Sequence, residues 1–443
     1  MSSISNLASA VSELSGSRCV GRVSEVVGLR LTVVGLERIL GVGARCRVHR
    51  SGDSVIGEVI GVDKRGSHLL PFGDWGGVGP GAEVECLPGV GTLRPGPEWV
   101  GRVINALGQP IDSLGPLAQG TSERPLHAEA PSPFHRRAVG ARIETGIKAL
   151  DVFAPLCRGQ RMGIFAGSGV GKSTLMSMLT RQAETDVVVV ALVGERGREV
   201  RDFVENALGE EGMRRAVLVV ATGDEAPLMR RQAAFTATSV AESFRDQGAN
   251  VLLMVDSVTR FAHAHREIGL SLGEPPAARG YPPTVFSLLP QLLERAGPGG
   301  EGQGNITALY TVLMDGDDPN DPIVDAVRGT LDGHIHLSRR VAERGRFPAI
   351  DVEKSLSRML PHCHSDQENE IMLQMRRALS RYGEMEDLVR LGVYKAGTNA
   401  LVDQSIKIAE KAEEALRQGT HSRVSTLEAF SEFSEILKDN TLS

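Results

Sequence analysis

The sequence is poor in aromatic residues, in paired cysteines and in long apolar runs. Only 4% of its 443 residues are aromatic, and its five cysteines stand singly, without a CxxC pair. This spacing excludes an even disulfide framework and favours reduced thiols. No run approaches the roughly 18 apolar residues of a membrane-spanning helix, and the N-terminus lacks the basic and apolar regions of a signal peptide. We therefore expect a cytoplasmic protein.

Excess positive charge is also missing. The 49 basic and 55 acidic residues give a net charge of -6, so charge alone gives no footprint for holding a polyanion. The length suggests about three domains of roughly 150 residues each. Glycine, by contrast, is abundant, with 51 residues. Because glycine permits tight turns and close approach of backbone to ligand, its placement guides the search for a site.

The N-terminal part of the chain divides into a short helical segment and a β-rich segment. Ile4, Leu7, Val11 and Leu14 recur at helical spacing within residues 1–18, which predicts either a frayed terminus or a helix that docks a partner. Residues 19–90 carry short β-branched runs punctuated by glycine and predict a small β-barrel. That barrel has two aromatic residues, too few for a base-stacking platform, which favours a structural or assembly role over oligonucleotide binding.

The remaining chain predicts an α/β domain over residues 91–360 and a helical domain over residues 361–443. Apolar runs alternate with helix-compatible stretches, which is typical of a mostly parallel sheet covered on both faces. Ligands of such sheets bind beyond the carboxyl ends of the strands. In the helical domain, the charged segment 407–417 predicts an amphipathic helix ended by Gly419. The predicted core strands cover residues 161–166, 187–193, 216–220, 251–255 and 306–314.

A P-loop is the strongest local signal. Residues 166–174 read AGSGVGKST, directly after an apolar run and before the helical stretch 175–182. Backbone N–H groups of such a loop wrap the β-phosphate of a nucleotide, Lys172 bridges the β- and γ-phosphates, and the Ser173 hydroxyl ligates Mg²⁺. Ala166 replaces the first glycine of the strict pattern, a mild departure at a position that mainly shapes the turn. The predicted nucleotide-binding residues are Gly167, Ser168, Gly169, Val170, Gly171, Lys172, Ser173 and Thr174.

Two carboxylates follow other apolar runs. Asp256 ends the run 251–255 and is predicted to face the P-loop as the carboxylate that orients Mg²⁺. Glu195 comes just after the next predicted strand, 187–193, and begins the following segment. We expect it to activate the attacking water, with the neighbouring Arg196 as a further catalytic candidate. The alternatives are a turn or N-cap role for Asp256 and a dipole-stabilised helix terminus for Glu195. The sequence leaves open whether Arg260 contacts a neighbouring subunit.

Together with two further segments, these motifs resemble the rotary ATP synthase α/β and type III secretion ATPases over nearly the whole chain. The segments are RVINALG at 102–108 and PAIDVEKSLSR at 348–358. The resemblance implies an α/β fold with a RecA-like P-loop core, an N-terminal β-barrel and a C-terminal helical domain. It also implies that Arg358 acts as an arginine finger in the neighbouring subunit's site, and that ATP and Mg²⁺ are the cofactors.

Three segments are similar to the flagellum-specific protein-export branch: YTVLMDGDD at 310–318, DPI at 321–323 and LDGHI at 331–335. The similarity implies a homohexameric ring that hydrolyses ATP to energise type III export of flagellar proteins at a membrane export gate, peripheral to the inner membrane. It implies a regulatory stator-like protein at the N-terminus, and a central stalk protein and export chaperones at the C-terminal helices. No nucleic-acid partner is expected.

Three other functions share parts of this pattern. An injectisome ATPase has the same core motifs, and its selectivity lies in terminal surfaces. A non-catalytic ring subunit like the synthase α chain keeps the P-loop but lacks the carboxylate that we assign to Glu195. An RNA translocase of the Rho type has a related core, but the aromatic-poor barrel and the negative net charge argue against it.

Overall fold

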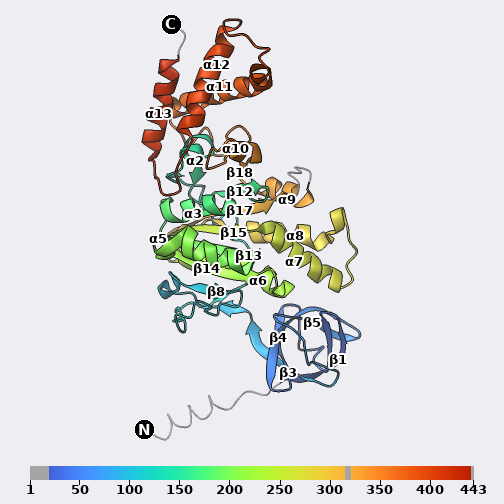
Figure 1. Cartoon of the computed structure of the whole chain (residues 1–443). Coiled ribbons are helices and arrows are strands. Elements are labelled where there is room, and N and C mark those ends of the chain that lie inside the picture. The colour runs from blue at the N-terminus through green and yellow to red at the C-terminus, as the bar shows by residue number, and fades with distance from the viewer. Residues whose placement is uncertain (1–18, 315–320, 441–443) are drawn as a thin grey trace, which may run out of the picture.

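The protein has a β-barrel at one end, an α/β core in the middle and a group of helices at the opposite end (Figure 1). A computed structural model describes residues 19–314 and 321–440. The helix predicted within residues 1–18 lies outside this range, as do residues 315–318 of one export-branch segment. The predicted fold class, an α/β P-loop core with an N-terminal barrel and C-terminal helices, is confirmed.

The N-terminal barrel is closed by six strands in the order β1-β2-β5-β4-β3-β6. Its two aromatic side chains are buried: Trp75 packs in the barrel core and donates its indole N–H to the Leu29 carbonyl at 2.8 Å, and Phe72 packs against the α/β core. Neither ring is therefore placed for stacking on a base. The strands are β1 Val20–Val27, β2 Arg30–Val34, β3 Ala44–Arg50, β4 Asp53–Asp63, β5 Gly66–Pro71 and β6 Glu83–Val90.

The core is a nine-stranded, mostly parallel sheet in the order β19-β18-β12-β17-β15-β13-β14-β8, with β16 paired to β17. All five predicted core strands are confirmed to within two residues at either end. Strand β8 adds an edge that the sequence pattern did not predict, because its three residues are too short to show a period. The strands are β8 Val103–Asn105, β12 Arg161–Ala166, β13 Val187–Glu195, β14 Ala216–Thr222, β15 Asn250–Asp256, β16 Gly297–Pro298, β17 Asn305–Leu313, β18 Gly333–Leu337 and β19 Leu356–Ser357.

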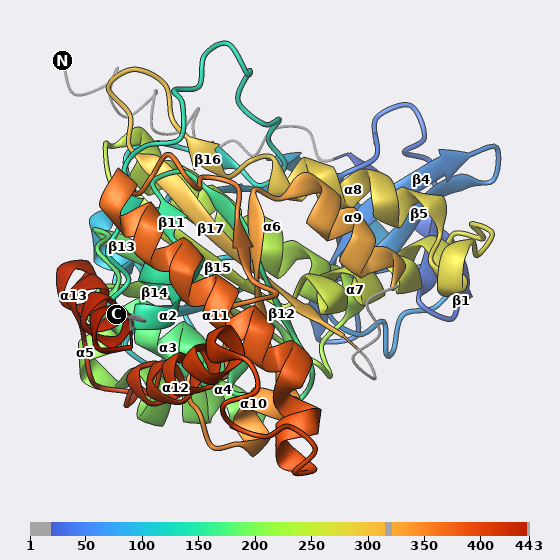
Figure 2. The ribbon, with the colours of Figure 1, turned by 90° about the horizontal axis from the view of Figure 1, so that it is seen from above.

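Helices bury both faces of this sheet (Figure 2). Along β13, Val189 and Ala191 pack into the cluster formed with α6–α9, whereas Val188 and Val190 pack into the cluster formed with α2, α3 and the C-terminal helices. The helices are α2 Lys148–Phe153, α3 Lys172–Gln182, α4 Gly197–Asp202, α5 Gly209–Met213, α6 Pro227–Asp246, α7 Val258–Ser271, α8 Pro283–Leu293, α9 Pro322–Thr330 and α10 Arg339–Glu343. Short two-stranded sheets pair β7 Thr92–Leu93 with β9 Arg124–Pro125 and β10 Arg142–Ile143 with β11 Leu156–Cys157.

The C-terminal helices are α11 Asp366–Arg390, α12 Ala400–Ala415 and α13 Thr426–Asp439. The prediction of a helix ended by Gly419 was wrong at both ends. The Asn399 side chain accepts from the amides of Leu401 and Val402 and so begins α12 earlier, and the helix ends at Ala415, four residues before Gly419. No helix in the described ranges is long and apolar enough to cross a bilayer.

A buried ion pair joins α6 to the segment that follows α8. Arg295, 1% exposed, donates to both carboxylate oxygens of Glu242, with Nη2–Oε2 and Nε–Oε1 distances of 2.6 and 2.9 Å. Glu242→Ala leaves a buried guanidinium without its carboxylate, so we expect the free energy of unfolding to fall by about 3–5 kcal/mol. Urea denaturation would measure this, with the exposed pair partner Glu205→Ala as a control that changes little. Equal losses in both variants would contradict the prediction.

Candidate active site

The three sequence-predicted site segments meet at one edge of the core sheet. Strands β12, β13 and β15 run parallel, so their carboxyl ends lie at the same edge. Strand β12 ends at Ala166 and leads into the P-loop, while Glu195 and Asp256 are the last residues of β13 and β15. Residues that are far apart in sequence are thus brought together by strand order alone.

The P-loop has the backbone conformation that a phosphate cradle needs. Gly169 and Gly171 have positive φ values of 79° and 97°, which favour glycine, and Gly171 is the N-cap of α3. The Val170 side chain is buried, so only its backbone is left for a ligand. The loop borders a cavity of about 480 Å³, lined by Gly167, Ser168, Gly169, Gly171, Lys172, Ser173, Thr174, Glu195, Arg196, Glu199, Arg260, Leu313 and Met314.

Lys172 lies between the two carboxylates. Its Nζ contacts Asp256 Oδ1 and is 3.6 Å from Glu195 Oε1. Thr311 on β17, which the sequence analysis did not single out, donates its hydroxyl to Asp256 Oδ1 at 2.7 Å and is fully buried. Thr311 therefore holds the Asp256 carboxylate in place from the neighbouring strand. Nothing local in the sequence marks this threonine, because its role arises only from strand pairing.

The environment of Glu195 favours proton uptake. Burial raises the pKa of the Glu195 carboxyl, and the nearby Asp256 charge raises that pKa further, while Lys172 and Arg260 oppose the rise. Its Oε1 is buried and accepts no hydrogen bond from the described residues. A carboxylate with a raised pKa and an oxygen without a hydrogen bond is suited to accept a proton from water.

Arg260 belongs to the site of its own chain. Its Nη1 donates to the Gly194 carbonyl and its Nη2 lies 3.4 Å from Glu195 Oε2. Gly194 permits this approach, since it has a φ of 70° and a Cβ there would lie 3.0 Å from the Arg260 side chain. Arg260 stands in the first turn of α7, where the helix dipole disfavours a cation. An arginine so soon after the predicted strand end at Asp256 was the feature of the sequence that could have marked Arg260 as a site residue.

Arg196 lies at the mouth of the cavity. Its side chain is 69% exposed and its Nη1 lies 3.3 Å from Glu199 Oε1. Ser173 and Asp256 both border a smaller adjoining cavity of about 120 Å³. Magnesium in nucleotide sites takes one or two protein ligands together with phosphate oxygens, and a hydroxyl and a carboxylate on one cavity wall fit that requirement.

Arg358 lies at the other end of the sheet. Its backbone N–H donates to the Asp332 carbonyl. The Asp332 carboxylate in turn accepts a hydrogen bond from the backbone N–H of Arg161, the first residue of β12. The P-loop begins after Ala166, about 16 Å further along the strand at roughly 3.3 Å per residue. The Arg358 side chain is exposed and makes no hydrogen bond or ion pair with the residues described here. Arg358 therefore does not serve the P-loop of its own chain.

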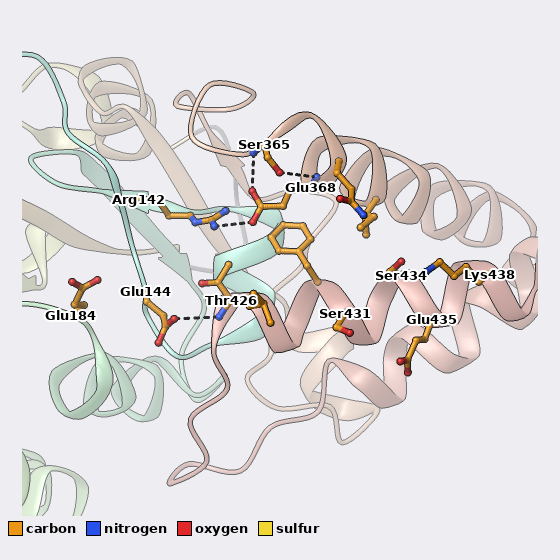
Figure 3. A pocket seen from close by; sticks show the side chains of 14 residues that line it. Arg142, Glu144, Glu184, Ser365, Glu368, Thr426, Ser431, Ser434, Glu435 and Lys438 are labelled. Atoms are coloured by element: carbon orange, nitrogen blue, oxygen red, sulfur yellow. Dashed lines mark hydrogen bonds and ion pairs between the residues drawn. The ribbon is translucent and has the colours of Figure 1, made fainter.

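A cavity of about 690 Å³, larger than the one beside the P-loop, lies beside the C-terminal helices (Figure 3). Two of its carboxylates are engaged in structural contacts: Glu368 accepts from Arg142 at 2.9 Å and caps α11, and Glu144 accepts from the amide of Thr426. It contains no phosphate-binding loop. The P-loop, Lys172 and Glu195 instead border the smaller cavity at the sheet edge.

Comparisons with known proteins agree with this geometry. The nucleotide-binding domain of the ATP synthase alpha/beta family matches residues 146–357, and the type III secretion EscN ATPase C-terminal domain matches residues 364–435. The flagellum-specific ATP synthase of Caulobacter vibrioides is 51% identical, covering 98% of this chain and 99% of the relative. The type 3 secretion system ATPase of Xanthomonas euvesicatoria is 44% identical, covering 92% and 91%.

Solved structures show the same fold. The assembled EscN ATPase of enteropathogenic E. coli, alone and in complex with its central stalk EscO, superposes with TM-scores of 0.87 and 0.85. Each is 39% identical to this chain and covers 94% of it and all of the EscN chain. By sequence over nearly its full length, and by a P-loop core with the family's C-terminal domain, the chain belongs to the family of flagellum-specific ATP synthases and type III secretion ATPases.

Proposed function

We propose that the chain is a Mg²⁺-dependent ATP hydrolase that energises type III export of flagellar proteins. The observation that carries the proposal is the meeting of Lys172, Asp256 and Glu195 in one cavity beside the P-loop. This set contains a phosphate-binding lysine, a metal-orienting carboxylate and a base. P-loop ATPases use groups of these kinds to transfer a phosphoryl group to water.

In the proposed mechanism the P-loop amides and Lys172 bind the phosphates of ATP, while Ser173 and Asp256 hold the metal ion. Mg²⁺, when bound, neutralises negative charge on the phosphates. Glu195 orients the attacking water and accepts its proton, as the raised pKa of its carboxyl favours. Arg260 positions Glu195 by holding Oε2, which leaves Oε1 toward Lys172.

The proposal includes a homohexameric ring, and the position of Arg358 supports sites that neighbouring subunits share. It lies too far from its own P-loop and is exposed, so it is available to complete a neighbour's site and to neutralise charge there. The assembled state of EscN supports a ring, and its complex with EscO supports a central stalk protein as a partner. The proposal also places export chaperones at the C-terminal helices and a regulatory protein at residues 1–18. It places the ring at a membrane export gate, on the cytoplasmic side of the inner membrane.

Lys172→Ala tests the nucleotide site. Because this variant removes the cation that contacts the phosphates, we expect ATP with Mg²⁺ to raise the Tm of the wild type but not that of the variant. Steady-state ATPase activity should be lost as well. Lys354→Ala, whose side chain is 66% exposed, is the matched control and should keep both the Tm rise and the activity. An unchanged ATP-dependent Tm rise in Lys172→Ala would disprove the site.

Arg260→Gln tests the role of Glu195 through pH. Arg260 lowers the pKa of the Glu195 carboxyl, so its removal lets that pKa rise further. Since Glu195 acts as a base only when deprotonated, the fall of kcat/KM on the acid side should move to higher pH in the variant. Measuring kcat/KM of both proteins between about pH 5 and pH 9 would show this shift. Arg198→Gln, in α4 close to Glu195 in the chain but paired with Glu199, should keep the wild-type profile.

The relative from Xanthomonas euvesicatoria, a type 3 secretion system ATPase, favours export of injectisome proteins as a second candidate. To decide between them, this chain is expressed in a strain that has lost swimming because its flagellar ATPase gene is deleted. Restored swimming supports the flagellar function. Restored secretion only in a strain lacking its injectisome ATPase supports the second.

A further inference from the structure

A cavity of about 320 Å³ lies at the junction between the barrel and the α/β core, and it shares no lining residue with the nucleotide site. Arg45 and Glu58 on strands β3 and β4 line it from the barrel side, and Arg231 on α6 lines it from the core side. Its size falls within the range of small-molecule sites. The other lining residues are Val42, Gly43, Gly91, His127, Phe235 and Leu288.

Two guanidinium groups and one carboxylate line this cavity. Arg231 Nη2 donates to Glu58 Oε1 at 2.5 Å, and both residues are more than nine-tenths buried. The Arg231 Nε is buried and finds no acceptor among the described residues. Arg45 lies over the Phe72 ring, 5.1 Å from its centroid, and forms no hydrogen bond or ion pair within the described ranges. Both guanidinium groups therefore keep donors that have no acceptor among the described residues.

The lining residues carry a net positive charge. Burial lowers the pKa of His127 to about 4, with Arg231 repulsion adding to the effect, so this histidine is neutral at pH 7. Burial also lowers the pKa of Arg45, which Glu58 opposes and Arg231 reinforces. Two positive groups and one negative group leave an excess of one positive charge. An uncompensated charge in a half-enclosed cavity favours binding of an anion.

We propose that this cavity binds a small organic anion, whose carboxylate or phosphate group lies between Arg45 and Arg231 and whose apolar part contacts Phe235 and Leu288. Charge-assisted hydrogen bonds from two guanidinium groups supply the recognition of the anion. Because Arg45 belongs to the barrel and Arg231 to the core, the bound anion joins these two parts of the chain. The inference stands apart from the ATPase function, since it concerns binding alone.

Isothermal titration calorimetry on the full-length protein tests the proposal with two probes, benzoate and phenyl phosphate. Saturating Mg²⁺-ADP is present, so that neither probe binds at the P-loop. The wild type is expected to bind at least one probe, and the preferred probe tells a carboxylate ligand from a phosphate ligand. Arg45→Gln should weaken that binding about tenfold or more, because a charge-assisted hydrogen bond is lost. Arg47→Gln, on the same strand but paired with Glu85, should bind like the wild type.

Leu288→Phe provides a second variant that keeps both arginines and instead fills the cavity. It should also weaken binding about tenfold or more, and circular dichroism would show that each variant is folded. Absence of binding for both probes in the wild type would overturn the proposal. So would wild-type affinity in either Arg45→Gln or Leu288→Phe.

Discussion

Arg358→Ala should lower the steady-state ATPase rate of the assembled protein by about 10³–10⁵-fold, or roughly 4–7 kcal/mol of transition-state stabilisation. The side chain is exposed and lies beside the start of β12, far from its own P-loop. In the proposed ring, its loss removes a charge from the neighbour's site, and we expect the fold to stay intact. Nucleotide binding, measured as the ATP-dependent rise in Tm, should remain. Arg377→Ala, an exposed arginine on α11, should keep full activity.

Mixing two inactive variants distinguishes a site shared between subunits from one contained in a single chain. A chain with Arg358→Ala keeps its Glu195, and a neighbour with Glu195→Gln keeps its Arg358, so a complete site forms where they meet in the right order. In a random one-to-one mixture about a quarter of the sites are complete. We expect activity to return toward that fraction. If the mixture stays as inactive as its components, Arg358 does not act across the interface.

Glu195→Gln is expected to lower kcat by about 10²–10⁴-fold, the range that a positioned general base contributes. The substitution keeps the shape of the side chain and removes the oxygen that accepts the proton. Because Lys172 and Asp256 remain, binding of Mg²⁺-ATP should be at least as tight as in the wild type. Single-turnover ATPase assays with a nucleotide-binding measurement would separate the two effects.

Glu205→Gln is the control for this substitution, since that glutamate is exposed and pairs with Arg201 on the same helical surface. It should retain the wild-type rate. Turnover of Glu195→Gln within a few-fold of the wild type would remove Glu195 as the base. That result would favour the alternative that the chain is a non-catalytic ring subunit.

Local motifs accounted for much of the site. The P-loop, Asp256 and Glu195 are recognisable in the sequence because each follows an apolar run, and parallel strands place such residues at one edge of the sheet. The barrel was harder to read. Strand β3 alternates arginine and histidine with its buried residues, so it lacks the β-branched run by which its neighbours were predicted.

The sequence by itself therefore determined the P-loop core, the carboxylates at its strand ends and the family resemblance, since all of these depend on residues close together in the chain. Only the tertiary structure decided that Arg260 holds Glu195 and that Thr311 holds Asp256. It also decided that Arg358 lies beyond reach of its own P-loop. These relations depend on strand order and register, which pair residues separated by tens of positions and leave no periodic trace in the sequence.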